Sequence, residues 1–148
     1  MRLAVRPDDR RLLLLHRAAG HRPRHHNHHP RRGAHAADLD APAAFHSALD
    51  GLGPCAFVSF DVDAIRAADN PAVSCPSPVG LSADDALAIA SAAGAAPSVR
   101  LVDVSEFSPG AASPSEAYRS AKLLAFMFYQ FALGRAKAHA RGATFIYE

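Results

Sequence analysis

The chain has 148 residues, of which 49% are hydrophobic and 20% charged, a composition typical of one globular domain. The longest apolar run is interrupted by Gln130 and is much shorter than the roughly 20 residues that a membrane span requires. Two cysteines, Cys55 and Cys75, are too few for a disulfide framework and lack the spacing of a thiolate metal site. The composition therefore argues against a membrane protein and a disulfide scaffold, and we expect a cytoplasmic protein.

The first 40 residues differ in charge from the rest, with nine arginines against four aspartates, whereas the remainder holds seven basic and ten acidic residues. A run of arginines and histidines between residues 17 and 32 offers few apolar side chains for a core. The histidines could chelate a transition metal opportunistically, and the basic segment could bind nucleic acid, but it lacks interleaved aromatics and a zinc-finger pattern. We therefore expect residues 1–37 to be a largely disordered leader, with nucleic-acid binding disfavoured.

The chain after this leader alternates between helix and strand patterns. Asp40 followed by Pro42 predicts the start of a short amphipathic helix that extends to about Leu52. The apolar run at residues 56–60 predicts a buried strand, and a loop rich in proline and serine follows at residues 67–80. The first half of a helix–strand–helix unit is thus visible in the pattern.

A capping signal marks the start of the next helix. Ser82 with Asp85 three residues later resembles a capping box, which opens an alanine-rich helix at residues 83–93. Gly94 is expected to end this helix as its C′ residue. A second strand is predicted at residues 99–104 because its apolar and β-branched residues follow this break.

The last helix has the strongest start signal in the chain. Ser113 and Glu116 flank Pro114, the arrangement of a capping box with proline in the first turn, and the helix should continue to about Ala140. Apolar side chains between residues 123 and 133 surround the helix rather than forming one stripe. Such a helix either packs between other elements, which we favour, or lies at a contact between subunits.

The element order predicts an α/β fold with a parallel sheet, because a helix of suitable length connects the two strands. In such sheets the carboxyl ends of the strands meet at one edge, and here Asp61, Asp63 and Glu106 follow the two strands. In extended backbone Asp61 and Asp63 project to the same side and can meet one or two cations. Carboxylates favour magnesium, calcium or manganese, and a metal pair can activate water. The alternative is a solvated strand end.

Three motifs in a fixed order go beyond this pattern. They are Ser59-Phe60-Asp61-Val62-Asp63, the loop Val73-Ser74-Cys75-Pro76-Ser77-Pro78-Val79-Gly80-Leu81-Ser82, and Ser105-Glu106-Phe107-Ser108-Pro109. Together they resemble the ureohydrolase family of arginases, agmatinases and formimidoylglutamases, which carry Ser-x-Asp-x-Asp, a proline-containing loop and Glu-x-x-Pro in this order. The residues of the second and third motifs resemble those of the formimidoylglutamase-like branch more than those of typical arginases.

The resemblance implies a fold and a chemistry. Residues 38–148 would form part of a three-layer α/β/α domain of the arginase type, and family members commonly form homo-oligomers. Of the two manganese ions of the family, Asp61 would bridge both and Asp63 would ligate one, while Glu106 would face the amidine or guanidine group of a small substrate. The implied reaction is hydrolysis of a carbon–nitrogen bond: formimidoylglutamate to glutamate and formamide, or agmatine or arginine with release of urea.

Two further motifs of the family, Gly-Gly-Asp-His and Asp-x-His-x-Asp, do not occur in the sequence. Since they supply the remaining metal ligands, the resemblance implies an incomplete site and weak or no activity of this chain alone. A truncated ureohydrolase gene joined to an unrelated leader accounts for both the missing motifs and the change in composition. The alternative is a non-catalytic remnant or binding partner of a full-length paralogue.

Overall fold

The computed structural model describes residues 11–15, 40–50 and 53–145. In chain order these residues form β1 (Arg11–Leu15), α1 (Ala41–Asp50), β2 (Ala56–Asp61), the short 3-10 helix η2 (Val62–Ala64), α2 (Ala83–Ala95), β3 (Val99–Ser105), the 3-10 helix η3 (Pro109–Ala111) and α3 (Pro114–Ala140). From α1 onward this is the predicted order of helix, strand, helix, strand, helix. None of the helices among these residues is long and apolar enough to cross a bilayer.

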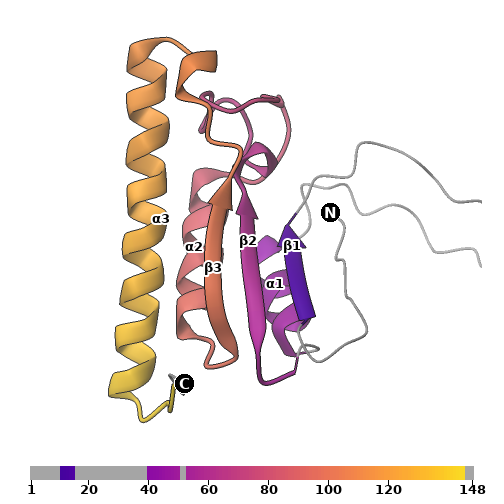
Figure 1. The fold of residues 1–148 in the computed structure, drawn as a ribbon, viewed down its shortest axis with the longest axis vertical. Helices are drawn as coiled ribbons and strands as arrows, with labels where there is room; N and C mark the ends of the chain where they lie inside the picture. The colour runs from indigo at the N-terminus through magenta and orange to yellow at the C-terminus, as the bar shows by residue number, and fades with distance from the viewer. Residues whose placement is uncertain (1–10, 16–39, 51–52, 146–148) are drawn as a thin grey trace, which may run out of the picture.

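The strands form a parallel sheet with β2 in the centre, between β1 and β3 (Figure 1). The parallel arrangement confirms the prediction for β2 and β3. Strand β1 was missed, because it lies in the segment 1–37 that the sequence predicts to be a largely disordered leader. Its five residues find their partners in β2, more than 40 positions along the chain, so no local pattern reveals the pairing. The other residues of that segment, including the histidine run, lie outside the described residues.

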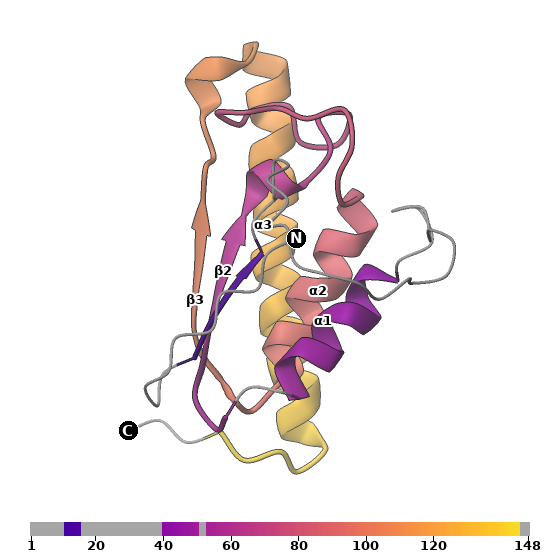
Figure 2. The same cartoon turned by 90° about the vertical axis from the view of Figure 1, so that its right-hand side faces the viewer.

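Helices α1, α2 and α3 all lie on one side of the sheet (Figure 2). Val58 and Phe60 of β2 point into this layer and belong to one buried cluster with Ile89 of α2 and Met127 of α3. Burying these apolar side chains is the main stabilising contribution to the fold. The described residues thus provide the sheet and one helical layer of the predicted three-layer α/β/α architecture.

The two longest helices, α2 and α3, touch at a pair of glycines. A Cβ atom on Gly94 of α2 would overlap the carbonyl oxygen of Phe131, and one on Gly134 of α3 would overlap the carbonyl oxygen of Ser91. The predicted role of Gly94 as the C′ residue is therefore wrong, since α2 continues through it to Ala95. The absence of a side chain serves the close approach of two helices, which a single helix sequence does not display.

Both predicted capping boxes are present. At the start of α2 the Asp85 amide donates to Ser82 Oγ at 3.1 Å, and the Ser82 amide donates to Asp85 Oδ2 at 2.9 Å. At the start of α3 the corresponding bonds join Ser113 and Glu116 at 3.4 and 3.0 Å. The bonds from Ser113 lower the pKa of the Glu116 carboxyl. These local signals fix where each helix begins, and hence where the preceding loops end.

Candidate active site at the carboxyl edge of the sheet

The predicted meeting of acidic residues at one edge of the sheet is visible in the strand register. Asp61, the last residue of β2, pairs with Ser105, the last residue of β3, and Glu106 follows directly. The loops after both strands gather at this end of the sheet, at the arrowheads in Figure 1. The parallel topology therefore brings the two acidic motifs together, although more than 40 residues separate them in sequence.

Asp61 is buried and turns the chain. Its Oδ1 accepts a hydrogen bond from the Asp63 amide at 3.1 Å, and Asp61 thereby acts as the N-cap of η2. Extended backbone was expected across both residues, and this expectation is wrong, because residues 62–64 form η2. The short carboxylate satisfies the amide two residues on, which favours a turn over a continued strand. As a result Asp63 faces the loop at residues 73–75.

Asp63 and Glu106 are joined through one hydroxyl group. Ser74 Oγ lies 2.6 Å from Glu106 Oε2 and 3.2 Å from Asp63 Oδ2. The Cys75 amide makes a longer contact of 3.5 Å to Asp63 Oδ1. The structure thus links the Asp-x-Asp motif to the Glu-x-x-Pro motif through the loop motif between them. The loop motif by itself indicates no role for Ser74, because only the fold shows that it lies between two carboxylates.

Glu106 adopts an unusual backbone conformation. Its φ of 68° makes it the one non-glycine residue with positive φ among the described residues. Such a conformation costs about 1–3 kcal/mol and persists only where neighbouring structure enforces it. Here Val73 pairs with Phe107 in an antiparallel bridge, and the Ser108 amide donates to the Ala72 carbonyl at 2.9 Å. Strain of this kind is concentrated at functional sites, which sets Glu106 apart from an ordinary loop residue.

Buried polar contacts to η2 and α3 hold the loop that carries Ser74. The side-chain amide of Asn70 donates to the Val62 carbonyl at 3.1 Å, and the Ala72 amide donates to Ser120 Oγ of α3 at 3.1 Å. Asn70 and Ser120 are both fully buried. These bonds tie the loop to η2 and to α3, so the position of Ser74 is set by the helical layer.

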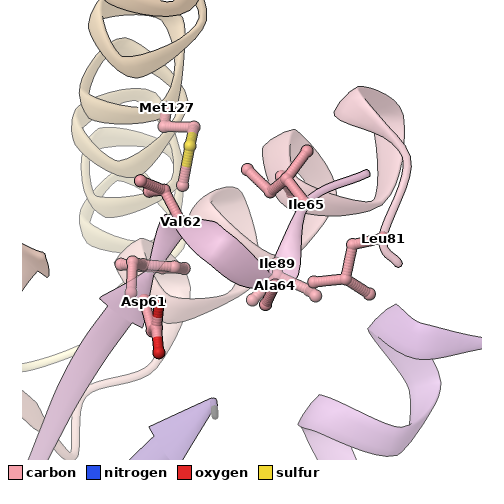
Figure 3. Close-up of a pocket in the computed structure, with 9 residues that line it drawn as sticks. Asp61, Val62, Ala64, Ile65, Leu81, Ile89 and Met127 are labelled. Carbon is pink, nitrogen blue, oxygen red and sulfur yellow. The ribbon is translucent and has the colours of Figure 1, made fainter. Parts of the chain in front are cut away.

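The other side of Asp61 is closed by apolar side chains. A cavity of about 10 Å³ lies there. Figure 3 shows the carboxylate of Asp61 pointing away from Met127. The lining residues are Phe60, Asp61, Val62, Ala64, Ile65, Leu81, Ala86, Ile89 and Met127. This volume is at most that of a single water molecule, and apolar cavities of this kind stay dry. Any ligand must therefore approach Asp61 from the side of its carboxylate.

Ser77 lies within the loop motif and Arg100 shortly before the third motif, but neither is part of the carboxylate cluster. Ser77 is buried, and its hydroxyl donates to the Val79 carbonyl at 2.8 Å within the same loop. Arg100 is exposed near the first residue of β3, at the opposite end of the strand from Glu106. Proximity to the motifs in sequence therefore does not place a residue in the carboxylate cluster.

The carboxylates have the right chemistry for a hard divalent cation, since manganese favours oxygen ligands. However, no group of three or more His, Cys, Asp or Glu side chains among residues 11–15, 40–50 and 53–145 is arranged to hold a metal ion. Asp61 and Asp63 alone are too few for tight binding, because affinity rises with the number of charged oxygens. Within the described part of the chain the donors fit manganese in kind, yet they do not complete a site.

Comparison with known proteins gives a consistent picture. A sequence model described as the arginase family matches residues 21–133. The match begins inside the segment 1–37, which was expected to be an unrelated leader. No curated protein matches the chain. The resemblance read from the three motifs is confirmed.

Solved structures show the same relationship. Trypanosoma cruzi formiminoglutamase with Mn2+2 is 44% identical, with a TM-score of 0.61, over 65% of this chain and 32% of that chain. The agmatine ureohydrolase of Thermoplasma volcanium is 25% identical, with a TM-score of 0.55, over 69% and 33%. The arginase of Bacillus subtilis, at 18% identity over 60% and 32% and a TM-score of 0.51, supports the fold alone. The chain spans about a third of the length of these relatives, and its predicted arginase-like α/β fold is confirmed.

Proposed function

The chain belongs to the arginase family, and from this premise we propose that residues 38–148 supply one part of a ureohydrolase active site that acts on a small linear amidine or guanidine. The observation that carries the proposal is the convergence of Asp61, Asp63 and Glu106 at one sheet edge, in a chain of which 65% aligns at 44% identity with a formiminoglutamase. A cluster of acidic oxygens suits both a divalent cation and a planar organic cation.

In this proposal Asp61 and Asp63 are the metal-binding residues. Asp61 and Asp63 would contribute carboxylate oxygens to the two manganese ions, and the other ligands would come from outside the described residues. The support is the carboxylate chemistry of the two side chains and the presence of Mn2+2 in the similar Trypanosoma cruzi enzyme. When bound, such a metal pair supplies an activated water for hydrolysis.

Glu106 is the proposed substrate-binding residue. An amidinium group is planar and presents paired N–H donors, which a carboxylate accepts with good geometry. Ser74 donates to Oε2 of Glu106, and no described residue donates to Oε1. One carboxylate oxygen is therefore fixed while the other can accept from a ligand.

Among the possible substrates we propose formimidoylglutamate ahead of agmatine and arginine. The basis is the identity of 44% to a formiminoglutamase compared with 25% to an agmatine ureohydrolase. The reaction would cleave a carbon–nitrogen bond of the substrate with water, giving glutamate and formamide.

A second candidate is a non-catalytic homologue that binds a full-length relative. The observation in its favour is the lack of any cluster of three or more metal-ligating side chains among the described residues. Titration with Mn²⁺ by calorimetry, combined with assays for formamide and urea release, separates the two. Metal-dependent turnover supports the enzyme, whereas binding without turnover supports the non-catalytic homologue; variants Asp61→Ala and Glu106→Ala should abolish turnover if it occurs.

A further inference from the structure

We infer that Ser74 is a positioning residue, whose hydroxyl orients the Glu106 carboxylate toward an amidinium ligand and holds it beside Asp63. The inference rests on the proposed function and deepens it, since it gives a role to a residue of the loop motif that had none. It is carried by the contacts of the Ser74 hydroxyl to Glu106 and Asp63 and by the fixed backbone on both sides of it.

The hydroxyl has one proton and two carboxylate neighbours. A serine hydroxyl donates one hydrogen bond, so at any moment it serves one carboxylate fully. The contact to Glu106 Oε2 is 2.6 Å, within the range of a short charge-assisted bond, whereas the contact to Asp63 Oδ2 is 3.2 Å. The proton therefore belongs mainly to Glu106, and Asp63 keeps its oxygens for a cation.

The backbone places Ser74 opposite Glu106. In the antiparallel bridge between Val73 and Phe107, the residue after Val73 faces the residue before Phe107. Ala72, just upstream, is held by Ser120 and by the Ser108 amide. Ser74 is thus presented by a fixed loop, which is what orienting another side chain requires.

Without this hydroxyl the Glu106 side chain would lose its only hydrogen bond among the described residues. Ser74 and Glu106 are both exposed, so water would replace the bond, and the three side-chain torsions of Glu106 would regain freedom. Binding an amidinium would then require ordering this side chain again, which weakens affinity. Metal binding at Asp61 and Asp63 should change much less.

The first test needs no ligand. A double-mutant cycle with Ser74→Ala and Glu106→Ala, measured by urea unfolding of the full chain, should show a coupling of about fivefold in the unfolding constant. The parallel cycle with Ser74→Ala and Asp63→Ala should show a smaller coupling. A Ser74–Glu106 coupling indistinguishable from unity overturns the inference.

The second test uses acetamidinium as a probe of the amidine class, titrated by calorimetry at saturating Mn²⁺. Ser74→Ala should weaken acetamidinium binding about tenfold, because the Glu106 side chain must then be ordered on binding. Ser74→Thr keeps a hydroxyl and should restore affinity to within about threefold of the original chain. Mn²⁺ affinity, measured separately, should change by less than about threefold in both variants, because Asp63 keeps its carboxylate.

Ser47→Ala is the matched control, since Ser47 is an exposed serine of α1 away from the sheet edge. It should leave both affinities unchanged. If the original chain binds acetamidinium and Ser74→Ala binds it equally well, or if Ser74→Thr is as weak as Ser74→Ala, the positioning role alone is overturned. If the original chain does not bind acetamidinium at all, the proposed role of Glu106 fails, and the positioning role fails with it.

Discussion

Different interactions stabilise the helical layer and the carboxylate edge, by which we mean Asp61, Asp63 and Glu106 with the loops that hold them at the carboxyl end of the sheet. Helices α2 and α3 pack through buried apolar side chains and a close glycine contact, and they lie on one side of the sheet in Figure 2. The edge depends instead on a few polar bonds and one strained residue, Glu106. The comparison shows that the stability of this chain is concentrated in one layer, while the candidate chemistry lies in the loops that the layer supports.

The contact between α2 and α3 should be the most sensitive to substitution. Gly134→Ala is expected to destabilise the chain by about 3 kcal/mol, because the new Cβ overlaps the Ser91 carbonyl and forces the helices apart. Helix propensity alone predicts the opposite sign, since alanine is preferred to glycine within helices. Urea unfolding distinguishes the two, with Gly110→Ala as the control, because nothing lies within 4 Å of a Cβ at that position. A stabilised Gly134→Ala variant would show that the helices do not approach this closely.

The bond that joins the two regions should have the next largest effect. Ser120→Ala removes the acceptor of the buried Ala72 amide and should cost about 2 kcal/mol, the penalty for an unsatisfied buried donor. Because Ala72 precedes the Ser74 loop, the same variant should also weaken acetamidinium binding. Thermal unfolding and the calorimetric titration measure these two effects. Loss of stability with unchanged acetamidinium affinity would contradict the idea that α3 positions the loop.

The sequence predicted the helical layer better than the edge, and the reason is the range of the interactions. Ser82 and Ser113 predict where the helices that follow them begin, because each capping box is completed within four residues. The role of Gly94 was misread because it depends on a second helix. Local signals thus predict where helices begin, and they do not reveal what the helices contact.

At the edge, the sequence predicted which acidic residues meet and missed how they meet. Asp61 and Glu106 lie together because parallel topology follows from element order. The capping turn at Asp61 and the bridging hydroxyl of Ser74 depend on local competition between side chain and backbone and on a contact across 32 residues. Neither has a periodic signature in the sequence.

The backbone strain at Glu106 should have a smaller effect on stability, and its sign is tested by comparing two variants. Glu106→Ala keeps the positive φ and removes the carboxylate, whereas Glu106→Gly removes both the carboxylate and the steric cost. The glycine variant should therefore be more stable than the alanine variant by about 0.5–1 kcal/mol, after the greater freedom of glycine in the unfolded chain is taken into account. Urea unfolding of the pair measures this difference. Equal or reversed stabilities would show that the backbone at this position is unstrained.

The smallest expected effect concerns the loop that runs between the two regions. Asp69 Oδ2 accepts from the Ala83 amide at 2.9 Å, at the start of α2, and from Arg66 Nε at 2.8 Å, and these bonds lower the pKa of its carboxyl. Because the pKa is lower in the folded chain than in the unfolded chain, the charged form contributes stability at neutral pH, and this contribution is lost as the pH falls through the folded value.

Asp69→Asn should therefore be less stable than the original chain at pH 7, by less than about 1 kcal/mol because Asp69 is partly exposed. The gap should begin to narrow below about pH 4, where the aspartate of the unfolded chain takes up a proton, and should close once the pH is below the lowered pKa of the folded chain. Urea midpoints at pH 7, 5 and 3 measure it. The control is Asp84→Asn, because Asp84 is an exposed carboxylate in the first turn of α2, the helix whose start Asp69 contacts. It reports the general effect of removing a negative charge there. A gap for Asp69→Asn that is unchanged at pH 3 would mean that the amide substitution acts through packing, and that the charge of Asp69 does not anchor the loop.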